Sequence, residues 1–394
     1  WYGHSRSDPR AYRTKEEETA WKARDPIPSF AARLVEADVC TQDEIDALEE
    51  RVEDAIEEAT QFALNSAMPP VEELENFLYA PFQWTAADHA KERELRDRCR
   101  AGGPGTRKLL YREALQEAAR EEMQRDPSVF IMGEDVGLYG GAYGATRDLF
   151  DEFGADRVRD TPISEATIGG AAVGAAMAGM RPIAEIMYVD FTPLAMDQIA
   201  NQGAKNRYMF GGKTIVPMVI RTEGGAGRSI AAHHSQSLEA LWTHFPGIYV
   251  AMPSTPFDAK GLLKAAVRDD NPVMFIEHKM LYGLEGHVPD EDYVIPYGVA
   301  DVKREGSDVT VVTYSRMVHR SLEAAEKLAE EGISVEVIDL RTLNPLDMDT
   351  IASSVKKNGR VVGVTEAYKT GSFISELAMR IQEEVFDWLD APVV

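Results

Sequence analysis

Short apolar runs alternate with helical segments from Leu109 onward, and this alternation constrains the fold more than any other feature of the chain. Loops rich in Gly or polar residues separate the runs, whose lengths suit buried strands. Such an alternation predicts a parallel sheet covered by helices on both faces. The expected strands lie in VFIMGED (129–135), RPIAEIMYVDF (181–191), TIVPMVIRT (214–222), GIYVAMPS (247–254) and PVMFIEH (272–278).

A second block with the same alternation begins near Tyr297 and predicts a separate, smaller α/β domain. We place the two α/β domains at residues 108–291 and 292–394. The strands expected in the second block lie in DVTVVTYS (308–315), ISVEVIDLRT (333–342) and GRVVGVTEA (359–367).

Residues 1–84 form a different, mainly helical part. Thr41 and Glu44 have the T-x-x-E spacing of a capping box, and apolar residues recur at intervals of three and four over the following turns. This pattern predicts an amphipathic helix that needs a partner surface. Residues 85–107 are charged, contain Gly and Pro and lack apolar periodicity, so we expect an exposed linker with a boundary near residue 105.

The composition excludes several classes of protein. The 394 residues carry a formal net charge of −24, which disfavours nucleic acid as a partner and favours a basic protein surface. No apolar run approaches the ~18 residues of a membrane span, so we expect no membrane association. Cys40 and Cys99 are the only cysteines, which favours a reducing, cytoplasmic setting. The chain starts at Trp1 without a signal-peptide pattern, so we expect a fragment of a longer polypeptide.

Glu165 is the most informative single carboxylate, because it stands between DTPIS and a helix of small and apolar residues. It can simply complement the dipole at the start of that helix, with Ser164 as the N-cap residue. It can equally be a desolvated carboxylate that shares a proton with a ligand. The residues alone leave these alternatives evenly balanced. Gly170, Gly174 and Ala178 recur every fourth residue, which predicts a smooth helix face at an interface.

His233 and His234 follow the Gly-rich loop EGGAGRS, and adjacent residues in extended backbone point to opposite sides. We therefore expect one of them to face a cleft as an acid or base, although a hydrogen-bonded structural histidine is the commoner case. Phe191 ends one expected strand, and core packing is its default interpretation.

Three further loops contain candidate ligands. Glu134, which begins the stretch EDVGLYGG, is either a cofactor ligand or a solvated strand end, and the loop lacks the order of a nucleotide-binding motif. The stretch RDDNP (268–272) is first of all a turn, whose carbonyls could also hold a monovalent cation. His4 and Ser5 lie in an arginine-rich loop that could be a linker or could bind a phosphate or carboxylate.

Taken together, these stretches resemble the β subunit of the thiamine-diphosphate-dependent first component of 2-oxo acid dehydrogenase complexes, over residues 108–394. Residues 1–84 are similar to the last part of the α subunit of the same enzyme, so the chain resembles an α–β fusion. The similar stretches are GEDVGLYGGAYGATRDLF (133–150), RDTPIS to YVDF (159–191), AAHHSQSLEALWTHFPG (231–247), PSTPFDAKGLL (253–263), RDDNPVMFIEHK (268–279), DLRTLNPLD (339–347) and WYGHSRSDPRAYRTKEE (1–17).

The resemblance implies a transketolase-like fold, with a pyrimidine-binding domain, a Rossmann-like C-terminal domain and a helical α-type tail. It implies that Glu165 hydrogen-bonds the pyrimidine ring nitrogen of thiamine diphosphate, which activates the thiazolium carbon for attack on a keto group. It implies further that Phe191 stacks on the pyrimidine and that His234 and His4 face the substrate.

The resemblance also implies cofactors and partners. Besides thiamine diphosphate, these are Mg²⁺ held mainly by an α-type portion, a lipoyl acyltransferase component, and a second copy of the fused chain in a homodimer. The carbonyls around Met218, Ala266, Asp269 and Asn271 match the family's monovalent-cation site, which would hold K⁺. Ser5 aligns with a serine that is phosphorylated in some relatives.

One feature departs from the family pattern, and the choice of substrate has more than one candidate. The GDG motif with a distant Asn, which binds Mg²⁺ and the diphosphate, does not occur in these 394 residues. Some stretches, such as GHSRSDP, favour pyruvate as the substrate, whereas MRPIAEIMYVDF is equally close to acetoin-cleaving relatives. The alternatives to a pyruvate-type dehydrogenase are therefore acetoin cleavage and a non-catalytic scaffold.

Overall fold

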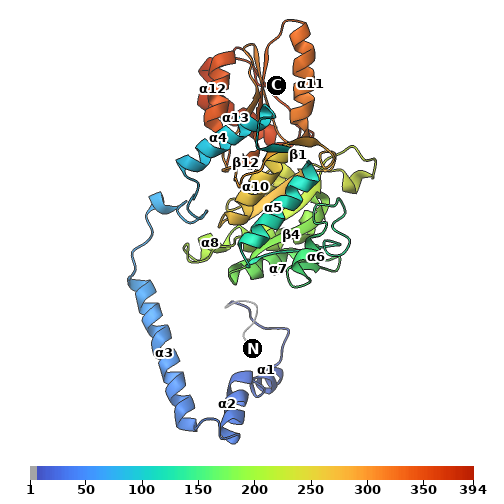
Figure 1. Cartoon of the computed structure of the whole chain (residues 1–394). Coiled ribbons are helices and arrows are strands. Elements are labelled where there is room, and N and C mark those ends of the chain that lie inside the picture. The colour runs from blue at the N-terminus through green and yellow to red at the C-terminus, as the bar shows by residue number, and fades with distance from the viewer. Residues whose placement is uncertain (1–6) are drawn as a thin grey trace. The chain divides into compact units, whose positions relative to one another are not determined.

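The computed structural model describes residues 7–394 and divides the chain into two units, one ending at Leu74 and one spanning Glu75–Val394. The first unit consists of helices joined by short turns (Figure 1). The predicted capping box is confirmed, because the Thr41 hydroxyl accepts from the Glu44 backbone N–H and the Glu44 carboxylate accepts from the Thr41 N–H. The helices of this unit are α1 (Lys15–Lys22), α2 (Pro26–Glu36), α3 (Gln42–Asn65) and the 3₁₀ turn η1 (Val71–Glu73).

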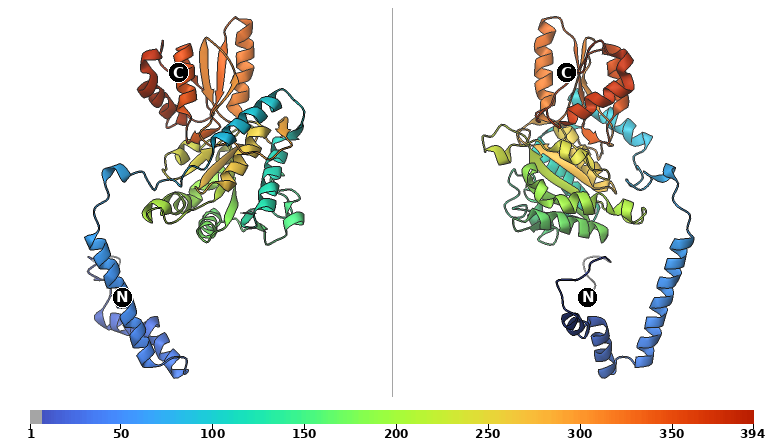
Figure 2. Two further views of the ribbon diagram at one scale, coloured as in Figure 1. Left: turned by 60° about the vertical axis from the view of Figure 1, so that its left-hand side comes forward. Right: turned by 180° about the vertical axis from the view of Figure 1, so that it is seen from behind.

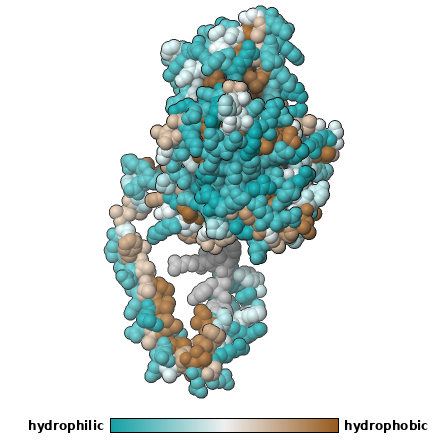
Figure 3. Space-filling view, viewed as in Figure 1, coloured by the Kyte–Doolittle hydropathy of each residue, from teal (hydrophilic) through white to brown (hydrophobic). Residues whose placement is uncertain are grey.

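The first unit leaves its apolar side chains uncovered by the described residues. No side chain of α1, α2 or α3 is buried within residues 7–394, and Figure 3 shows apolar residues gathered along these helices. The amphipathic pattern therefore formed helix α3, as predicted, and its partner surface is not among the described residues of this unit. A groove between α2 and α3 is lined mainly by Pro26, Ile27, Phe30, Ala31, Leu34, Ile45 and Leu48.

The second unit is built on a seven-stranded sheet with the order β12-β6-β7-β5-β4-β2-β3, in which every pair except β12 with β6 is parallel. This confirms the predicted parallel sheet. The strands are β2 (Val129–Gly133), β3 (Val158–Asp160), β4 (Arg181–Tyr188), β5 (Val219–Gly224), β6 (Tyr249–Ala251), β7 (Val273–His278) and β12 (Thr342–Asn344).

Helices cover both faces of this sheet (Figures 1 and 2). Alternate residues of β2 show the two faces: Ile131 belongs to the core under α5 and α10, and Met132 belongs to the core under α7. The helices and turns of this layer are α5 (Tyr111–Arg125), α6 (Leu149–Phe153), α7 (Glu165–Met177), η2 (Val189–Ala195), η3 (Asp197–Gly203), α8 (Asn206–Met209), η4 (Ala232–His234), α9 (Glu239–Thr243) and α10 (Pro256–Arg268).

A four-stranded sheet with the order β13-β10-β11-β9 forms the C-terminal part. The expected strand 333–342 ends at Asp339, because the chain turns there and continues as β12 in the larger sheet. The C-terminal part therefore contributes one strand, β12, to the larger sheet. The remaining elements are β9 (Asp301–Arg304), β10 (Val309–Thr313), β11 (Val335–Asp339), β13 (Val361–Gly363), α11 (Arg316–Glu330), α12 (Met348–Asn358), α13 (Phe373–Val385), η5 (Phe386–Trp388) and the two-stranded pair β1 (Thr106–Leu110) and β8 (Glu285–Pro289).

The prediction of an exposed linker at residues 85–107 is wrong for α4 (Ala86–Arg100), which buries Glu92, Leu95 and Cys99. The sequence hid this burial because one inward residue is charged. Its carboxylate accepts from the fully buried guanidinium of Arg341, at 2.9 Å between Glu92 Oε1 and Arg341 Nη1. Helix α4 is therefore an integral part of the second unit.

Arg341 lies at the centre of a buried cluster of charges. Its Nε donates to Asp258 at 2.8 Å and its Nη2 lies 3.4 Å from Asp301. Lys303 Nζ lies 2.7 Å from Asp258 and 2.8 Å from Asp301, which balances the carboxylates. The cluster joins α4 and α10 to the C-terminal part. Among residues 7–394, no helix is long and apolar enough to cross a membrane.

Candidate active site

Four side chains predicted from the sequence follow the carboxyl ends of adjacent parallel strands. Glu134 follows β2, Glu165 follows β3, Phe191 follows β4 and His234 lies in the loop after β5. The order β5-β4-β2-β3 places these strand ends along one edge of the sheet. Open parallel sheets bind ligands at this edge.

Glu165 is the first residue of α7 and is only 8% exposed. Within residues 7–394, the Ser164 hydroxyl caps no backbone N–H of this helix and instead lies 2.9 Å from the Thr167 hydroxyl. Ser164 is therefore the N-cap residue, as expected, but its side chain does not cap the helix. The Glu165 carboxylate lies at the positive end of the helix, where a buried negative charge is stabilised.

Glu134 is half-buried, and its Oε1 has no hydrogen-bond partner among the residues that the structure describes. Burial raises the pKa of Glu134, and the negative charges of Glu165, Asp135 and Glu185 raise it further. Carboxylates thus gather at this point of the sheet edge, and the solvated strand end is the less suitable description of Glu134.

Phe191 and His234 belong to an aromatic cluster. The His234 ring meets Tyr188 edge to face with centroids 4.7 Å apart, and Phe191 at 5.4 Å. His234 Nδ1 is buried and finds no hydrogen-bond partner within residues 7–394. A buried nitrogen in this state is suited to a ligand or to proton transfer.

The two histidines do not alternate as extended backbone would place them. Both lie in the turn η4, where their rings are 4.6 Å apart, and His233 is exposed while His234 is half-buried. One histidine therefore faces inward, as expected, but the turn and not strand geometry selects it.

A polar group next to this cluster was missed by the sequence analysis. The Tyr143 hydroxyl lies 2.9 Å from the Tyr188 hydroxyl and donates to Glu223 Oε1 at 2.7 Å. Burial raises the pKa of Glu223 to about 7, although the Tyr143 hydrogen bond and the charge of Lys279 act to lower it. Lys279 Nζ donates to the His234 carbonyl and lies over the Tyr188 ring. The only sequence signal for this group was the position of Glu223 at the end of β5.

A second group that the sequence did not reveal is a buried triad on the neighbouring strands β4, β5 and β7. The Arg221 guanidinium on β5 pairs with Glu185 on β4 and Glu277 on β7, and the Tyr282 hydroxyl donates to Glu277 at 2.6 Å. The strand pairing sets Arg221 opposite Glu185 on β4 and two residues away from Glu277 on β7, so the charges meet only because the sheet places these strands side by side. Tyr282 stacks on Tyr143, which joins the triad to the polar group beside His234.

The proposed cation ligands lie beside the end of α10. Asp269 and Asn271 are buried and bonded to each other, with Asn271 Nδ2 donating to Asp269 Oδ1 at 2.7 Å. The Asp269 carbonyl accepts from Arg181 Nη1 at 2.9 Å, and the Met218 carbonyl accepts from the Val273 N–H at 2.9 Å. Arg181 also pairs with the Asp270 carboxylate, and the cation site stays a prediction. The fourth ligand of the proposed set, Ala266, lies within α10.

Other predicted site features have a limited structural description. His4 and Ser5 lie outside the described residues. Within the described part of the chain, no group of three or more His, Cys, Asp or Glu side chains is arranged to hold a metal ion. The residues at the sheet edge fit a heterocycle with a proton-accepting ring nitrogen, because a buried carboxylate, an aromatic ring and an unpaired imidazole nitrogen are present.

Three family models match the chain. They are the transketolase pyrimidine binding domain over residues 107–285, the transketolase C-terminal domain over 298–394 and the dehydrogenase E1 component over 1–72. The predicted transketolase-like α/β fold with a helical N-terminal part is therefore confirmed.

The chain is also similar to characterised proteins. It is 51% identical over 297 residues to the β subunit of acetoin:2,6-dichlorophenolindophenol oxidoreductase from Cupriavidus necator, covering 73% of this chain and 88% of that protein. It is 51% identical over 286 residues to the 2-oxoisovalerate dehydrogenase β subunit of Bacillus subtilis, covering 72% and 88%. It is 48% identical over 286 residues to the pyruvate dehydrogenase E1 β subunit of Gracilaria tenuistipitata var. liui, covering 73% and 88%.

A solved structure described as a split-gene transketolase, inactive β4 tetramer, is similar with a TM-score of 0.60 and 27% identity, over 73% of this chain and 88% of that one.

Proposed function

This chain belongs to the family of E1 β subunits of 2-oxo acid dehydrogenases, joined to a segment of a dehydrogenase E1 component, and we propose that it catalyses oxidative decarboxylation of a small 2-oxo acid. Thiamine diphosphate is the proposed cofactor and pyruvate the first candidate substrate. The two-carbon fragment would pass to a lipoyl group on an acyltransferase partner.

One observation carries the proposal: a buried carboxylate, Glu165, begins a helix at the same sheet edge as Phe191 and His234. Bound thiamine diphosphate would supply the thiazolium ring that takes up the electron pair released with CO₂. Glu165 would hold a proton against the pyrimidine nitrogen, and Phe191 would orient the ring by stacking. His234 would exchange a proton with the substrate through its unpartnered Nδ1.

Binding of the diphosphate needs a further portion of the enzyme. We propose that Mg²⁺ and the diphosphate are held by an α-type portion, since the sequence lacks GDG. His4 would join the substrate side from the α-like segment. Potassium at the carbonyls beside Asp269 and Asn271 stays a prediction on which no step depends, because Arg181 already bonds there.

Assembly into a dimer of fused chains is also proposed. Gly174 on α7 and Ala178, the C-cap residue of this helix, are exposed, and a Cβ on Gly174 would meet no atom within 4 Å. Small residues on an uncovered helix face permit close approach of another helix. The expected domain boundaries at 84, 107 and 291 and the cytoplasmic location stay predictions.

Acetoin is the second candidate substrate, because β subunits of acetoin oxidoreductases from two bacteria are 51% and 47% identical to the chain. The deciding experiment assays the assembled enzyme, including its diphosphate-binding portion, with pyruvate, branched 2-oxo acids and acetoin and with a dye as electron acceptor. Turnover of a 2-oxo acid supports the proposal and turnover of acetoin alone supports the alternative. No turnover of any substrate would leave a scaffold role and overturn both.

A further inference from the structure

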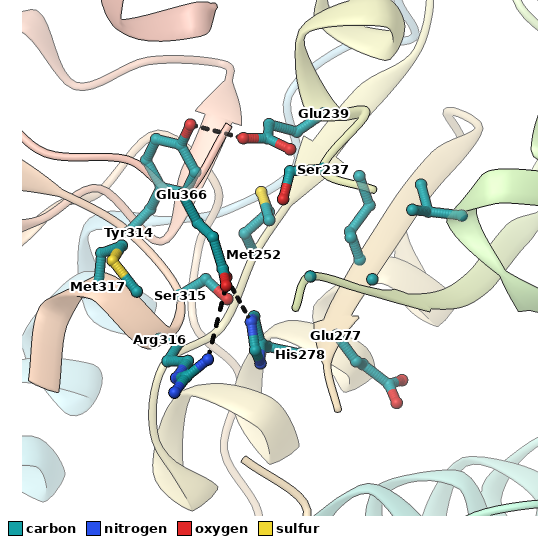
Figure 4. A pocket seen from close by; sticks show the side chains of 14 residues that line it. Ser237, Glu239, Met252, Glu277, His278, Tyr314, Ser315, Arg316, Met317 and Glu366 are labelled. Atoms are coloured by element: carbon teal, nitrogen blue, oxygen red, sulfur yellow. Dashed lines mark hydrogen bonds and ion pairs between the residues drawn. The ribbon is translucent and has the colours of Figure 1, made fainter. Parts of the chain in front are cut away.

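Glu366, which follows β13 in the C-terminal part, bonds to His278 and Arg316 (Figure 4) and also contacts the start of the loop between β5 and His234. Its Oε1 accepts from the backbone N–H of Ala226 at 3.2 Å, close to the start of that loop. Arg316 Nη1 donates to the Ala226 carbonyl at 3.2 Å and lies 3.5 Å from Glu366 Oε1. Both backbone groups of Ala226 are therefore held from the C-terminal part.

The other oxygen of Glu366 bonds to His278, at 2.6 Å between Oε2 and Nε2. The Met280 backbone N–H donates to His278 Nδ1 at 3.1 Å, which assigns the imidazole proton to Nε2 and makes it the donor to Glu366. Burial lowers the pKa of His278, in agreement with a neutral ring. His278 thus orients the Glu366 carboxylate toward Ala226.

The contact between loop and carboxylate is too close for any side chain at Gly225. A Cβ there would lie 2.1 Å from His278 Nε2 and 3.0 Å from Glu366 Oε2, and its φ of +83° also favours glycine. At the far end of the loop, Lys279 holds the His234 carbonyl. The loop is therefore fixed at both ends.

Between these ends the loop has an unfavourable backbone. Ser229 and Ala231 both have left-handed φ values, of 57° and 70°. Non-glycine residues in this region are strained, and such a conformation persists only where surrounding contacts determine it. The contacts of Ala226 with Glu366 and Arg316 are among the contacts that hold this loop in its strained conformation.

We propose that Glu366 is a positioning residue that sets the place of His234 by fixing the start of its loop. The C-terminal part thereby controls the geometry of the catalytic edge of the neighbouring sheet. The inference rests on the proposed role of His234, and it adds a residue that does not touch the substrate.

The test measures hydrogen–deuterium exchange of residues 225–236 and steady-state kinetics in the assembled enzyme, for Glu366→Ala, Glu366→Gln and Gly225→Ala. Glu366→Ala should speed exchange in the loop and lower kcat between about 10-fold and about 100-fold, with KM changed less, because a displaced catalytic group costs rate. The side chain of Glu366→Gln can still accept a hydrogen bond from the Ala226 N–H, so its kcat should fall less than that of Glu366→Ala. Gly225→Ala should show the same faster exchange in the loop and the same lower kcat as Glu366→Ala.

The control is Glu323→Gln on α11, which removes an exposed pair with Arg320 and should change neither measurement. Unchanged loop exchange in both Glu366→Ala and Gly225→Ala would overturn the inference. An unchanged kcat of Glu366→Ala would also overturn it if the separate variant His234→Ala has a lowered kcat. If His234→Ala keeps full turnover, the proposed function of His234 is wrong, and the exchange result still decides whether Glu366 fixes the loop. Should Glu366→Ala fail to fold, Glu366→Gln and Gly225→Ala decide the question.

Discussion

The rings of Phe191 and His234 lie 5.4 Å apart between centroids and cross at 82°, although the two residues follow different strands. Phe191 leaves β4 and His234 lies in the loop after β5, and these strands are neighbours in the sheet. An edge-to-face contact fixes the plane of the imidazole and leaves Nδ1 without a partner among the described residues. The pair thus combines an aromatic surface with a group that can transfer a proton.

Glu165→Gln should abolish decarboxylation while leaving the fold intact. Glutamine keeps the size of the side chain and cannot share a proton with a ring nitrogen. The measurement is turnover with the preferred 2-oxo acid, alongside circular dichroism and the thermal midpoint. Glu326→Gln, an exposed carboxylate on α11, serves as the matched control. Near-normal turnover of Glu165→Gln would contradict the proposed role.

His234→Ala should lower kcat about 100-fold, the order of effect of losing one acid–base group. His233→Ala is the matched control, because it removes the adjacent, exposed imidazole and should stay within about twofold of the parent enzyme. Steady-state kinetics of both variants check the prediction. Equal effects of the two substitutions would show that the inward position of His234 has no catalytic meaning.

Glu223 should make stability fall as the pH rises. Its pKa of about 7 in the folded protein lies above its ordinary value of 4.5, so the folded state binds the proton more tightly. The stabilisation is fully present below the ordinary value and is lost as the pH rises through about 7. Between pH 5.5 and pH 8 this loss amounts to about 2 kcal/mol of unfolding free energy.

The measurement compares urea unfolding of the parent and Glu223→Gln at these two pH values. From pH 5.5 to pH 8, the unfolding free energy of the parent should fall by that amount relative to the unfolding free energy of Glu223→Gln. Tyr143→Phe removes a hydrogen bond that lowers the pKa of Glu223, so it should move the transition to higher pH. Parallel stability profiles of parent and Glu223→Gln would refute the prediction.

Arg341→Met should destabilise the protein by about 3–5 kcal/mol, because it leaves the buried Glu92 carboxylate without its guanidinium partner. It also leaves Asp258 and Asp301 with Lys303 as the cation they share. Arg380→Met on α13 removes an exposed pair with Glu376 and should cost no more than about 1 kcal/mol. Chemical denaturation of both variants gives the comparison. A loss of similar size in the two would mean that the burial of Arg341 does not matter.

The strands and helices could be predicted because their signals lie close together in the sequence. The expected runs at 129–135, 181–191 and 272–278 contain β2, β4 and β7, and the capping box at Thr41 begins α3. The prediction of an exposed linker at residues 85–107 was wrong because the decisive interaction joins residues that are far apart in the sequence. The inward face of α4 carries Glu92, whose partner Arg341 is far away in the chain, so no local pattern reveals the burial.

By itself the sequence determined the order of secondary structure, the family resemblance and the positions of Glu165, Phe191 and His234 along the chain. Only the tertiary structure decided that Tyr143 and Glu223 lie beside Tyr188, that Lys279 bonds to the His234 carbonyl and that Glu366 holds the loop of His234. The physical reason is the range of the interactions. Periodicity and capping act between residues a few positions apart, whereas burial and charge pairing depend on which strand ends and loops the folded chain brings together.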